Sequence, residues 1–299
     1  MKICCILNEK AGSADLAGRD IVVDLFSKHG VSVNIYETRE GNSVSDLASL
    51  AVRQKFDIIV AGGGDGTINA VATALIGHPS ARLAILPLGT LNHFARDLDI
   101  PFDVSRAIEI ICAGHSKSVD VGIVNDCYFL NNSSVGLYPA IVRLRESLQS
   151  AGYSKWLAAL LSSLRILVKF RRFDLEVQPS DGPFIKRKTP LLFVGNNAYE
   201  TALTKLGRRT TIDRGRLWIS LPISQTRMGF ILGLVALVFQ REKTTDTLIF
   251  EATSLKVSSK KRHLTVATDG EIVHLKPPLN YRMLPRALNV LVPVPQSEA

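Results

Sequence analysis

The sequence predicts two domains: an α/β domain built on a parallel sheet, followed by a mainly antiparallel β-sandwich with inserted helices. Strand and helix signals alternate over the first part of the chain, which is typical of a parallel sheet covered on both faces. From about Ser118 onward, short strand signals separated by turn residues are typical of an antiparallel sandwich. We therefore assign residues 1–120 to the α/β domain, residues 121–295 to the β-sandwich and residues 296–299 to a polar tail.

The elements of the first domain follow from apolar runs and their spacing. Strands are predicted at residues 2–7, 31–37, 58–60 and 83–86. Helices are predicted at residues 16–29, 45–54, 68–76 and 104–113, with a short one ending at Asp97. Because helices separate the successive strands, the strands are expected to run parallel.

In the second domain, several stretches alternate apolar and polar residues. Strands are predicted at residues 119–124, 127–131, 173–177, 191–195, 216–220, 254–257, 264–267 and 288–292. Two helical stretches interrupt them, at residues 138–170 and 226–241. With 46% apolar residues in a chain of 299, each domain can bury its own core.

A glycine-rich turn follows the third predicted strand. Gly62, Gly63 and Gly64 come directly after an unalternating apolar run, and Thr67 is a plausible N-cap of the next helix. Backbone N–H groups at such a turn and helix start favour phosphate. Asp65 would repel phosphate unless a cation lies between them, so the turn indicates a metal-bound nucleotide. The alternative is a tight strand-to-helix turn with a capping aspartate.

Two further loops follow strands of the same predicted sheet. The loop at residues 8–13 offers asparagine, lysine, glycine and serine, and residues 87–96 form a second strand-to-helix turn. Since the carboxyl ends of parallel strands line one crevice, both loops could converge on one nucleotide. The alternative for Asn92 and Arg96 is a helix cap and a surface cation.

A pair of carboxylates stands near the other end of the chain. Asp269 and Glu271 flank Gly270 after a predicted strand. Such a sequence is often only a turn. However, phosphoryl transfer needs a carboxylate that accepts the proton of the attacking hydroxyl, and this pair could supply it from the second domain.

Taken together, these motifs resemble the diacylglycerol kinase catalytic-domain family, which includes bacterial lipid kinases and, more distantly, sphingosine and ceramide kinases. The resemblance covers nearly the whole chain. It implies a nucleotide-binding domain of NAD-kinase or phosphofructokinase type, a β-sandwich for the lipid, and ATP in the cleft between them. The residues implied to bind ATP are Asn8, Lys10, Ala11, Gly12, Thr38, Gly62, Gly63, Gly64, Asp65, Gly66, Thr67, Ile68, Thr90 and Asn92.

The resemblance also implies catalytic roles. Asp65 would act through Mg²⁺ on the phosphates of ATP, and Glu271, with Asp269 beside it, would deprotonate the lipid hydroxyl. Which of the two carboxylates accepts the proton stays open. The acceptor could be diacylglycerol, phosphatidylglycerol, a sphingoid base or another long-chain alcohol.

Three positions depart from the family pattern. Glu9 stands where proline is usual, and His93 stands where many relatives carry aspartate. In the family's second magnesium site, Arg214 replaces the usual aspartate. Either that metal is absent and Arg214 replaces its charge, or Asp213 ligates it instead.

Charge and hydropathy limit the partners. The net charge of +9 suits a polyanionic partner, but no nucleic-acid motif accompanies the basic runs, so we expect no nucleic acid. No apolar run reaches the roughly 20 residues of a membrane-spanning helix, and no signal peptide is evident. We expect a cytoplasmic protein that associates peripherally with the membrane through residues 156–172 or 228–239, unless these stretches simply pack on the second sheet. A homodimer stays open.

Two other functions compete with an ATP-dependent lipid kinase. An NAD kinase shares the glycine turn and the two-domain plan but phosphorylates a soluble acceptor. A non-catalytic regulator would bind nucleotide or lipid without turnover. The loop at residues 87–96 and the pair of Asp269 and Glu271 favour the lipid kinase.

Overall fold

The computed structural model describes residues 2–8, 18–38, 41–136, 172–199, 209, 211–222 and 247–295. The chain forms two compact units: unit 1 comprises Met1–Val121 and Pro285–Ala299, and unit 2 comprises Gly122–Leu284. The sequence assigned residues up to 295 to the second domain, whereas the chain from Pro285 onward packs with unit 1. The predicted helical stretches at residues 138–170 and 226–241 lie outside the described residues, as does the predicted tail.

Unit 1 contains a parallel sheet with the strand order β2-β1-β3-β4. Its strands are β1 (Ile3–Leu7), β2 (Val33–Glu37), β3 (Ile58–Gly63) and β4 (Arg82–Pro87). Every residue of β1 and β3 is buried, because both faces of the sheet are covered. The chain returns near its end, where Val290 pairs in parallel with Leu83 of β4.

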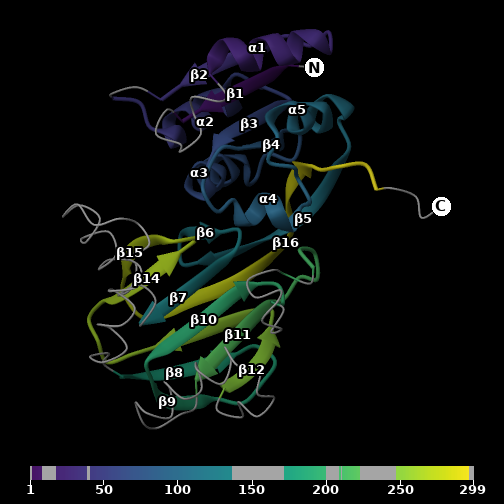
Figure 1. Cartoon of the computed structure of the whole chain (residues 1–299). Coiled ribbons are helices and arrows are strands. Elements are labelled where there is room, and N and C mark those ends of the chain that lie inside the picture. The colour runs from purple at the N-terminus through teal and green to yellow at the C-terminus, as the bar shows by residue number, and fades with distance from the viewer. Residues whose placement is uncertain are drawn as a thin grey trace. The chain divides into compact units, whose positions relative to one another are not determined.

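Five helices belong to the described part of unit 1, and four of them pack in two pairs against this sheet. They are α1 (Arg19–Lys28), α2 (Val44–Arg53), α3 (Asp65–Leu75), α4 (His93–Asp97) and α5 (Val104–Ala113). Helix α1 contacts α5 and α2 contacts α3, and Figure 1 shows the two pairs on opposite faces of the sheet. Helix α2 begins at Val44 because Ser43 and Asp46 form a reciprocal capping box. The predicted α/β fold of this part is confirmed.

Unit 2 consists mainly of antiparallel strands in two layers. The first sheet has the strand order β12-β11-β10-β7-β14-β15. In the second sheet, β8 pairs with β9 and with β13, and β13 also pairs with β16. The bounds are β5 (Ser116–Val124), β6 (Cys127–Phe129), β7 (Asn132–Gly136), β8 (Phe173–Pro179), β9 (Ile185–Thr189), β10 (Leu191–Asn196), β11 (Leu217–Pro222), β12 (Thr247–Ala252), β13 (Ser254–Ser258), β14 (Leu264–Thr268), β15 (Glu271–Leu275) and β16 (Leu279–Leu291).

The core of unit 2 lies between these layers. Alternate residues of β8, such as Leu175 and Val177, belong to the same buried cluster as Val194 and Val266 of the six-stranded sheet. Tyr281 is fully buried in this core and shares a hydrogen bond of 3.1 Å with Ser133. The predicted antiparallel β-sandwich is therefore confirmed.

Candidate functional site

Unit 1 gathers the predicted nucleotide-binding loops at one edge of its sheet. Asn8 follows β1, Thr38 follows β2, the glycine turn ends β3 and the loop at residues 87–92 follows β4. These four strands are neighbours and parallel, so their carboxyl ends lie together. The structure thus brings most of the predicted residues of unit 1 to a single edge. Lys10, Ala11 and Gly12 lie outside the described residues.

A polar network joins three of these segments. The hydroxyl of Thr38 donates to Oδ1 of Asn8 at 3.4 Å, and Nδ2 of Asn8 donates to Oγ1 of Thr67 at 2.9 Å. Thr67 is buried in the first turn of α3, so the network holds that turn against the end of β1. It also fixes the orientation of the Asn8 carboxamide.

The start of α3 differs from its prediction. The helix begins at Asp65 with Gly64 as its N-cap, so the expectation that Thr67 caps a helix over residues 68–76 is wrong. Gly64, the N-cap of α3, has no side chain that could accept a hydrogen bond from the first N–H groups of the helix. One oxygen of Asp65 accepts the N–H of Phe94 at 3.3 Å, which ties α4 to the start of α3. The first turn of α3 therefore keeps N–H groups that an anion could accept.

The loop after β4 is shaped by Asn92. Its side chain donates to the carbonyls of Pro87 and Gly89 and accepts the N–H of Gly89 at 3.1 Å, and its backbone is left-handed with φ of 49°. Asn92 is buried, so it holds the loop from within. Ile68 is likewise buried, and its N–H donates to Gly64. In contrast, Gly66 and Thr90 are exposed at this edge.

Gly64 and Gly89 bring the two turns into direct contact. A Cβ built at Gly89 would overlap the Cα of Gly64 and lie 2.6 Å from Oδ1 of Asn92. The Cα of Gly64 belongs to the backbone, and the Asn92 side chain is held by hydrogen bonds, so neither can shift easily. We expect Gly89→Ala to lower the free energy of unfolding by roughly 1–3 kcal/mol, as overpacked sites do. Denaturant titration measures this loss, and Gly18→Ala is the matched control because a Cβ there meets nothing within 4 Å.

In unit 2, Asp269 and Gly270 form the two-residue turn of the hairpin between β14 and β15. Both have positive φ, of 47° and 89°, as the favoured two-residue hairpin turn requires. The Asp269 carboxylate accepts three backbone N–H groups, from Leu130 at 2.7 Å, Asn131 at 2.9 Å and Asn132 at 3.0 Å. Asp269 therefore anchors the hairpin to the start of β7.

Glu271 stands at the start of β15, opposite Thr268. Its side chain is exposed, yet partial desolvation by the surrounding protein raises the pKa of Glu271, and the charge of Asp269 raises it further. The carboxylate of Asp269 accepts three N–H groups, whereas the side chain of Glu271 is exposed to solvent. The structure thus assigns different surroundings to the two carboxylates.

A buried polar cluster supports the segment that Asp269 binds. Arg209 donates to the carbonyl of Leu130, and Nδ2 of Asn196 donates to the same carbonyl at 2.8 Å. The hydroxyl of Tyr199 donates to the carbonyl of Asn131 at 2.9 Å. These residues were not predicted from the sequence. Arg209 belongs to a basic run, and only the Asn pairs at 131–132 and 196–197 indicate a buried polar network.

Among the described residues, no three His, Cys, Asp or Glu side chains lie close enough to hold a metal ion together. Asp213 is partly buried, and the backbone N–H of the exposed Arg214 donates to Oδ1 of Asn197 at 3.0 Å. The assignment of Asp213 as a metal ligand remains a prediction. In the described parts of the chain, no helix is long and apolar enough to cross a membrane.

Comparisons with solved structures indicate the class of protein. The whole chain resembles solved α/β kinases: a candidate diacylglycerol kinase from Bacillus anthracis superimposes with a TM-score of 0.78 at 25% identity, over 98% of this chain and 97% of that chain. An NAD kinase from Archaeoglobus fulgidus, solved with ATP, shares the fold with a TM-score of 0.52 at 12% identity, over 97% and 93% of the two chains.

The sequence comparisons point to the same class of kinase. The family model of the diacylglycerol kinase catalytic domain matches residues 2–124. A diacylglycerol kinase of Staphylococcus aureus is 26% identical over 273 residues, which cover 89% of this chain and 84% of the relative. Residues 2–124 thus resemble the diacylglycerol kinase catalytic domain, and the comparisons support a kinase of that family.

Proposed function

We propose that this chain is an ATP-dependent lipid kinase, which transfers the γ-phosphoryl group of ATP to a hydroxyl of diacylglycerol or a similar lipid. The observation that carries the proposal is the hairpin turn of unit 2. Three N–H groups hold Asp269 there, and the exposed Glu271 keeps a raised pKa. A carboxylate whose pKa is raised is a stronger base than an ordinary one. It therefore suits proton abstraction from an alcohol. We therefore assign Glu271 as the base and Asp269 as the residue that positions it.

For the phosphoryl donor, we propose the carboxyl edge of unit 1. The residues there fit a nucleotide phosphate, because the first turn of α3 lacks a side-chain cap and Thr90 is exposed beside it. Asp65 fits a magnesium ion, since Mg²⁺ is usually held by one or two carboxylates together with substrate phosphates. When bound, Mg²⁺ would neutralise negative charge on those phosphates. Lys10, Ala11 and Gly12 belong to this proposal through the family resemblance.

The lipid as acceptor is supported by the family and by the diacylglycerol kinase relatives. The net charge of +9 suits a substrate in an anionic bilayer, so we include peripheral association with the membrane in the proposal. A soluble dinucleotide is the second candidate acceptor, favoured by the fold shared with the NAD kinase.

Labelled ATP tests the proposal directly. The chain is incubated with labelled ATP, Mg²⁺ and either a total lipid extract or NAD, and each product is identified. We expect the label in a lipid phosphate monoester. Label in the dinucleotide would select the second candidate, and no transfer to either acceptor would favour a binding protein without turnover.

The pH dependence of turnover follows from the raised pKa of Glu271. A base must be deprotonated, so kcat/KM is expected to fall as the pH is lowered through a pKa above the usual range of glutamate. The decline therefore begins at a higher pH than an unperturbed glutamate would give. Profiles of kcat/KM against pH measure it. Glu251→Gln, which removes a carboxylate on β12, should leave the profile unchanged; a decline at or below the usual glutamate range would contradict the assignment.

A further inference from the structure

Arg209 is a buried cation in unit 2, with an exposed fraction of 7%. Burying a guanidinium is costly unless hydrogen bonds replace the water that it loses. Its Nη1 donates to the carbonyl oxygens of Leu130 at 2.6 Å and of Asn196 at 3.3 Å, and its Nη2 donates to Oδ1 of Asn131 at 3.4 Å. The planar fork of arginine serves several acceptors at once, which the single ammonium group of lysine does less well.

The peptide group between Leu130 and Asn131 lies between Arg209 and Asp269. Its carbonyl oxygen accepts the hydrogen bond of 2.6 Å from Arg209, and its N–H donates to Oδ1 of Asp269 at 2.9 Å. Hydrogen bonds in a chain polarise one another, so a donor at the carbonyl oxygen strengthens the bond that the N–H donates. The guanidinium and the carboxylate are therefore coupled through one peptide group.

The next peptide group has the same arrangement with neutral donors. The carbonyl of Asn131 accepts the Tyr199 hydroxyl at 2.9 Å and the N–H of Asn196 at 2.8 Å. The N–H of Asn132 donates to Oδ1 of Asp269 at 3.0 Å. Both peptide groups thus direct their N–H toward one carboxylate, and Arg209 supplies the positive charge on the opposite side.

The same carboxylate anchors the turn that carries Glu271. Asp269 lies in the two-residue turn between β14 and β15, and Glu271 is the first residue of β15. A base must be held in a defined orientation toward the hydroxyl that it deprotonates, because small displacements lower the rate strongly. The orientation of Glu271 therefore depends on the N–H groups that hold Asp269.

We propose that Arg209 is a positioning residue for proton transfer by Glu271, acting through the Leu130–Asn131 peptide group and Asp269. The inference rests on the lipid kinase activity proposed above. Arg209 fixes the segment at residues 130–132 in the orientation that Asp269 needs, and it thereby fixes the turn before Glu271.

Amide hydrogen exchange tests this coupling without any substrate. The full-length chain labelled with ¹⁵N is compared by NMR with Arg209→Gln, which has no charge at this position. We expect exchange at residues 130–132 to accelerate at least about tenfold, since a hydrogen bond to a charged group contributes on that order to local stability. The amides of Leu175 and Val177 should keep their rates, because β8 belongs to the other sheet.

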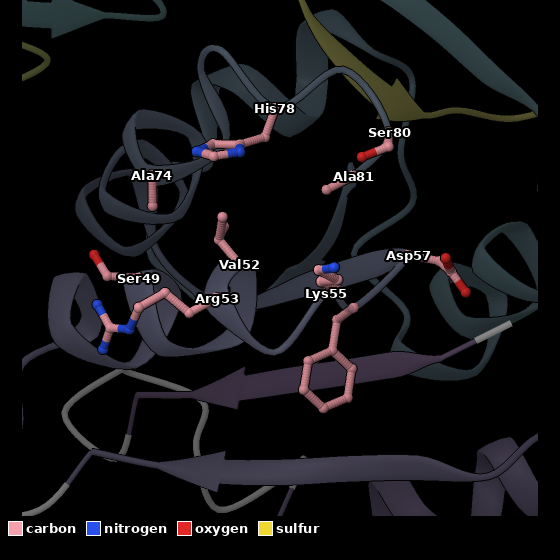
Figure 2. Close-up of a pocket in the computed structure, with 10 residues that line it drawn as sticks. Ser49, Val52, Arg53, Lys55, Asp57, Ala74, His78, Ser80 and Ala81 are labelled. Atoms are coloured by element: carbon pink, nitrogen blue, oxygen red, sulfur yellow. The ribbon is translucent and has the colours of Figure 1, made fainter.

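Arg53→Gln is the matched control. Arg53 is an exposed arginine in the last turn of α2, and Figure 2 shows it beside a hollow of unit 1. Its replacement should leave exchange at residues 130–132 unchanged. Arg209→Lys keeps a cation but loses the fork, so it should accelerate exchange less than Arg209→Gln. If Arg209→Gln does not fold, Arg209→Lys decides the test, with acceleration expected at residues 130–132 and none in β8.

Turnover tests the positioning role. Arg209→Gln should lower kcat for lipid phosphorylation at least about tenfold. The KM for ATP should be unchanged, because the predicted ATP-binding residues belong to unit 1. Arg209→Lys should retain more turnover. In an Asp269→Asn background, Arg209→Gln should have little further effect, because its effect passes through Asp269.

The proposal is overturned if exchange at residues 130–132 stays unchanged, or if β8 accelerates equally, which would indicate general destabilisation. It is also overturned if Arg209→Gln lowers kcat by the same factor with and without Asp269→Asn. No transfer by the unsubstituted chain would overturn the proposed function and the positioning role together. The exchange rates separate the two failures, because they report the coupling of Arg209 to Asp269 whether or not the chain turns over.

Discussion

Glu271→Gln is expected to lower kcat for lipid phosphorylation by roughly 10²- to 10⁴-fold, the usual contribution of a general base. The amide is nearly the same size as the carboxylate but cannot accept the proton of the attacking hydroxyl. Because Glu271 is exposed, the substitution should leave the melting temperature close to that of the unsubstituted chain. Steady-state kinetics with saturating ATP and lipid measure the loss.

Two measurements make this result specific to proton transfer. Nucleotide affinity, measured separately, should be unchanged, since the substitution adds or removes nothing in unit 1. Glu271→Asp keeps a carboxylate on a shorter side chain, so it should retain more turnover than Glu271→Gln. If Glu271→Gln turns over as fast as the unsubstituted chain, Glu271 is not the base.

Asp269→Ala is expected to lower the free energy of unfolding by roughly 3–5 kcal/mol, since hydrogen bonds to a charged group contribute about 1.5–3 kcal/mol each and water recovers part of the loss. Three backbone N–H groups lose their acceptor at once: those of Leu130, Asn131 and Asn132. Turnover should fall as well, because the turn that carries Glu271 loses its anchor. Chemical denaturation followed by circular dichroism measures the change.

Asp126→Ala is the matched control for this substitution. Asp126 is an exposed acid in the two-residue turn of another hairpin, between β5 and β6. Its removal should cost under about 0.5 kcal/mol, as exposed substitutions usually do. Equal losses in the two variants would mean that the three N–H contacts of Asp269 contribute little.

The sequence predicted the first unit well because its signals are local. Apolar strands alternating with helices define a parallel sheet, and the glycines at 62–64 mark the edge where loops gather. In unit 2, strands with little apolar alternation were missed. Strand β9 (Ile185–Thr189) carries three consecutive basic residues and was interpreted only as a charged run. Strand β7 contains two adjacent serines, Ser133 and Ser134.

The roles of individual site residues depended on contacts between distant segments. Asp269 and Glu271 are chemically alike and two positions apart, so spacing could not separate them. The two carboxylates differ because Asp269 accepts three backbone N–H groups, which lie 137–139 positions away in the chain. Thr67 was expected to cap a helix, but it accepts a hydrogen bond from Asn8, 59 positions earlier. Buried hydrogen bonds of this kind have no sequence period.

The return of the chain to unit 1 at Pro285 makes that unit discontinuous. A single proteolytic cut between the units cannot release it, because Val290 pairs with Leu83 while the intervening chain forms unit 2. A ribosome that has synthesised the chain only as far as Val121 has therefore not yet supplied the strand segment that pairs beside β4. Completion of the parallel sheet must wait until Val290 has been synthesised, which happens after the whole of unit 2.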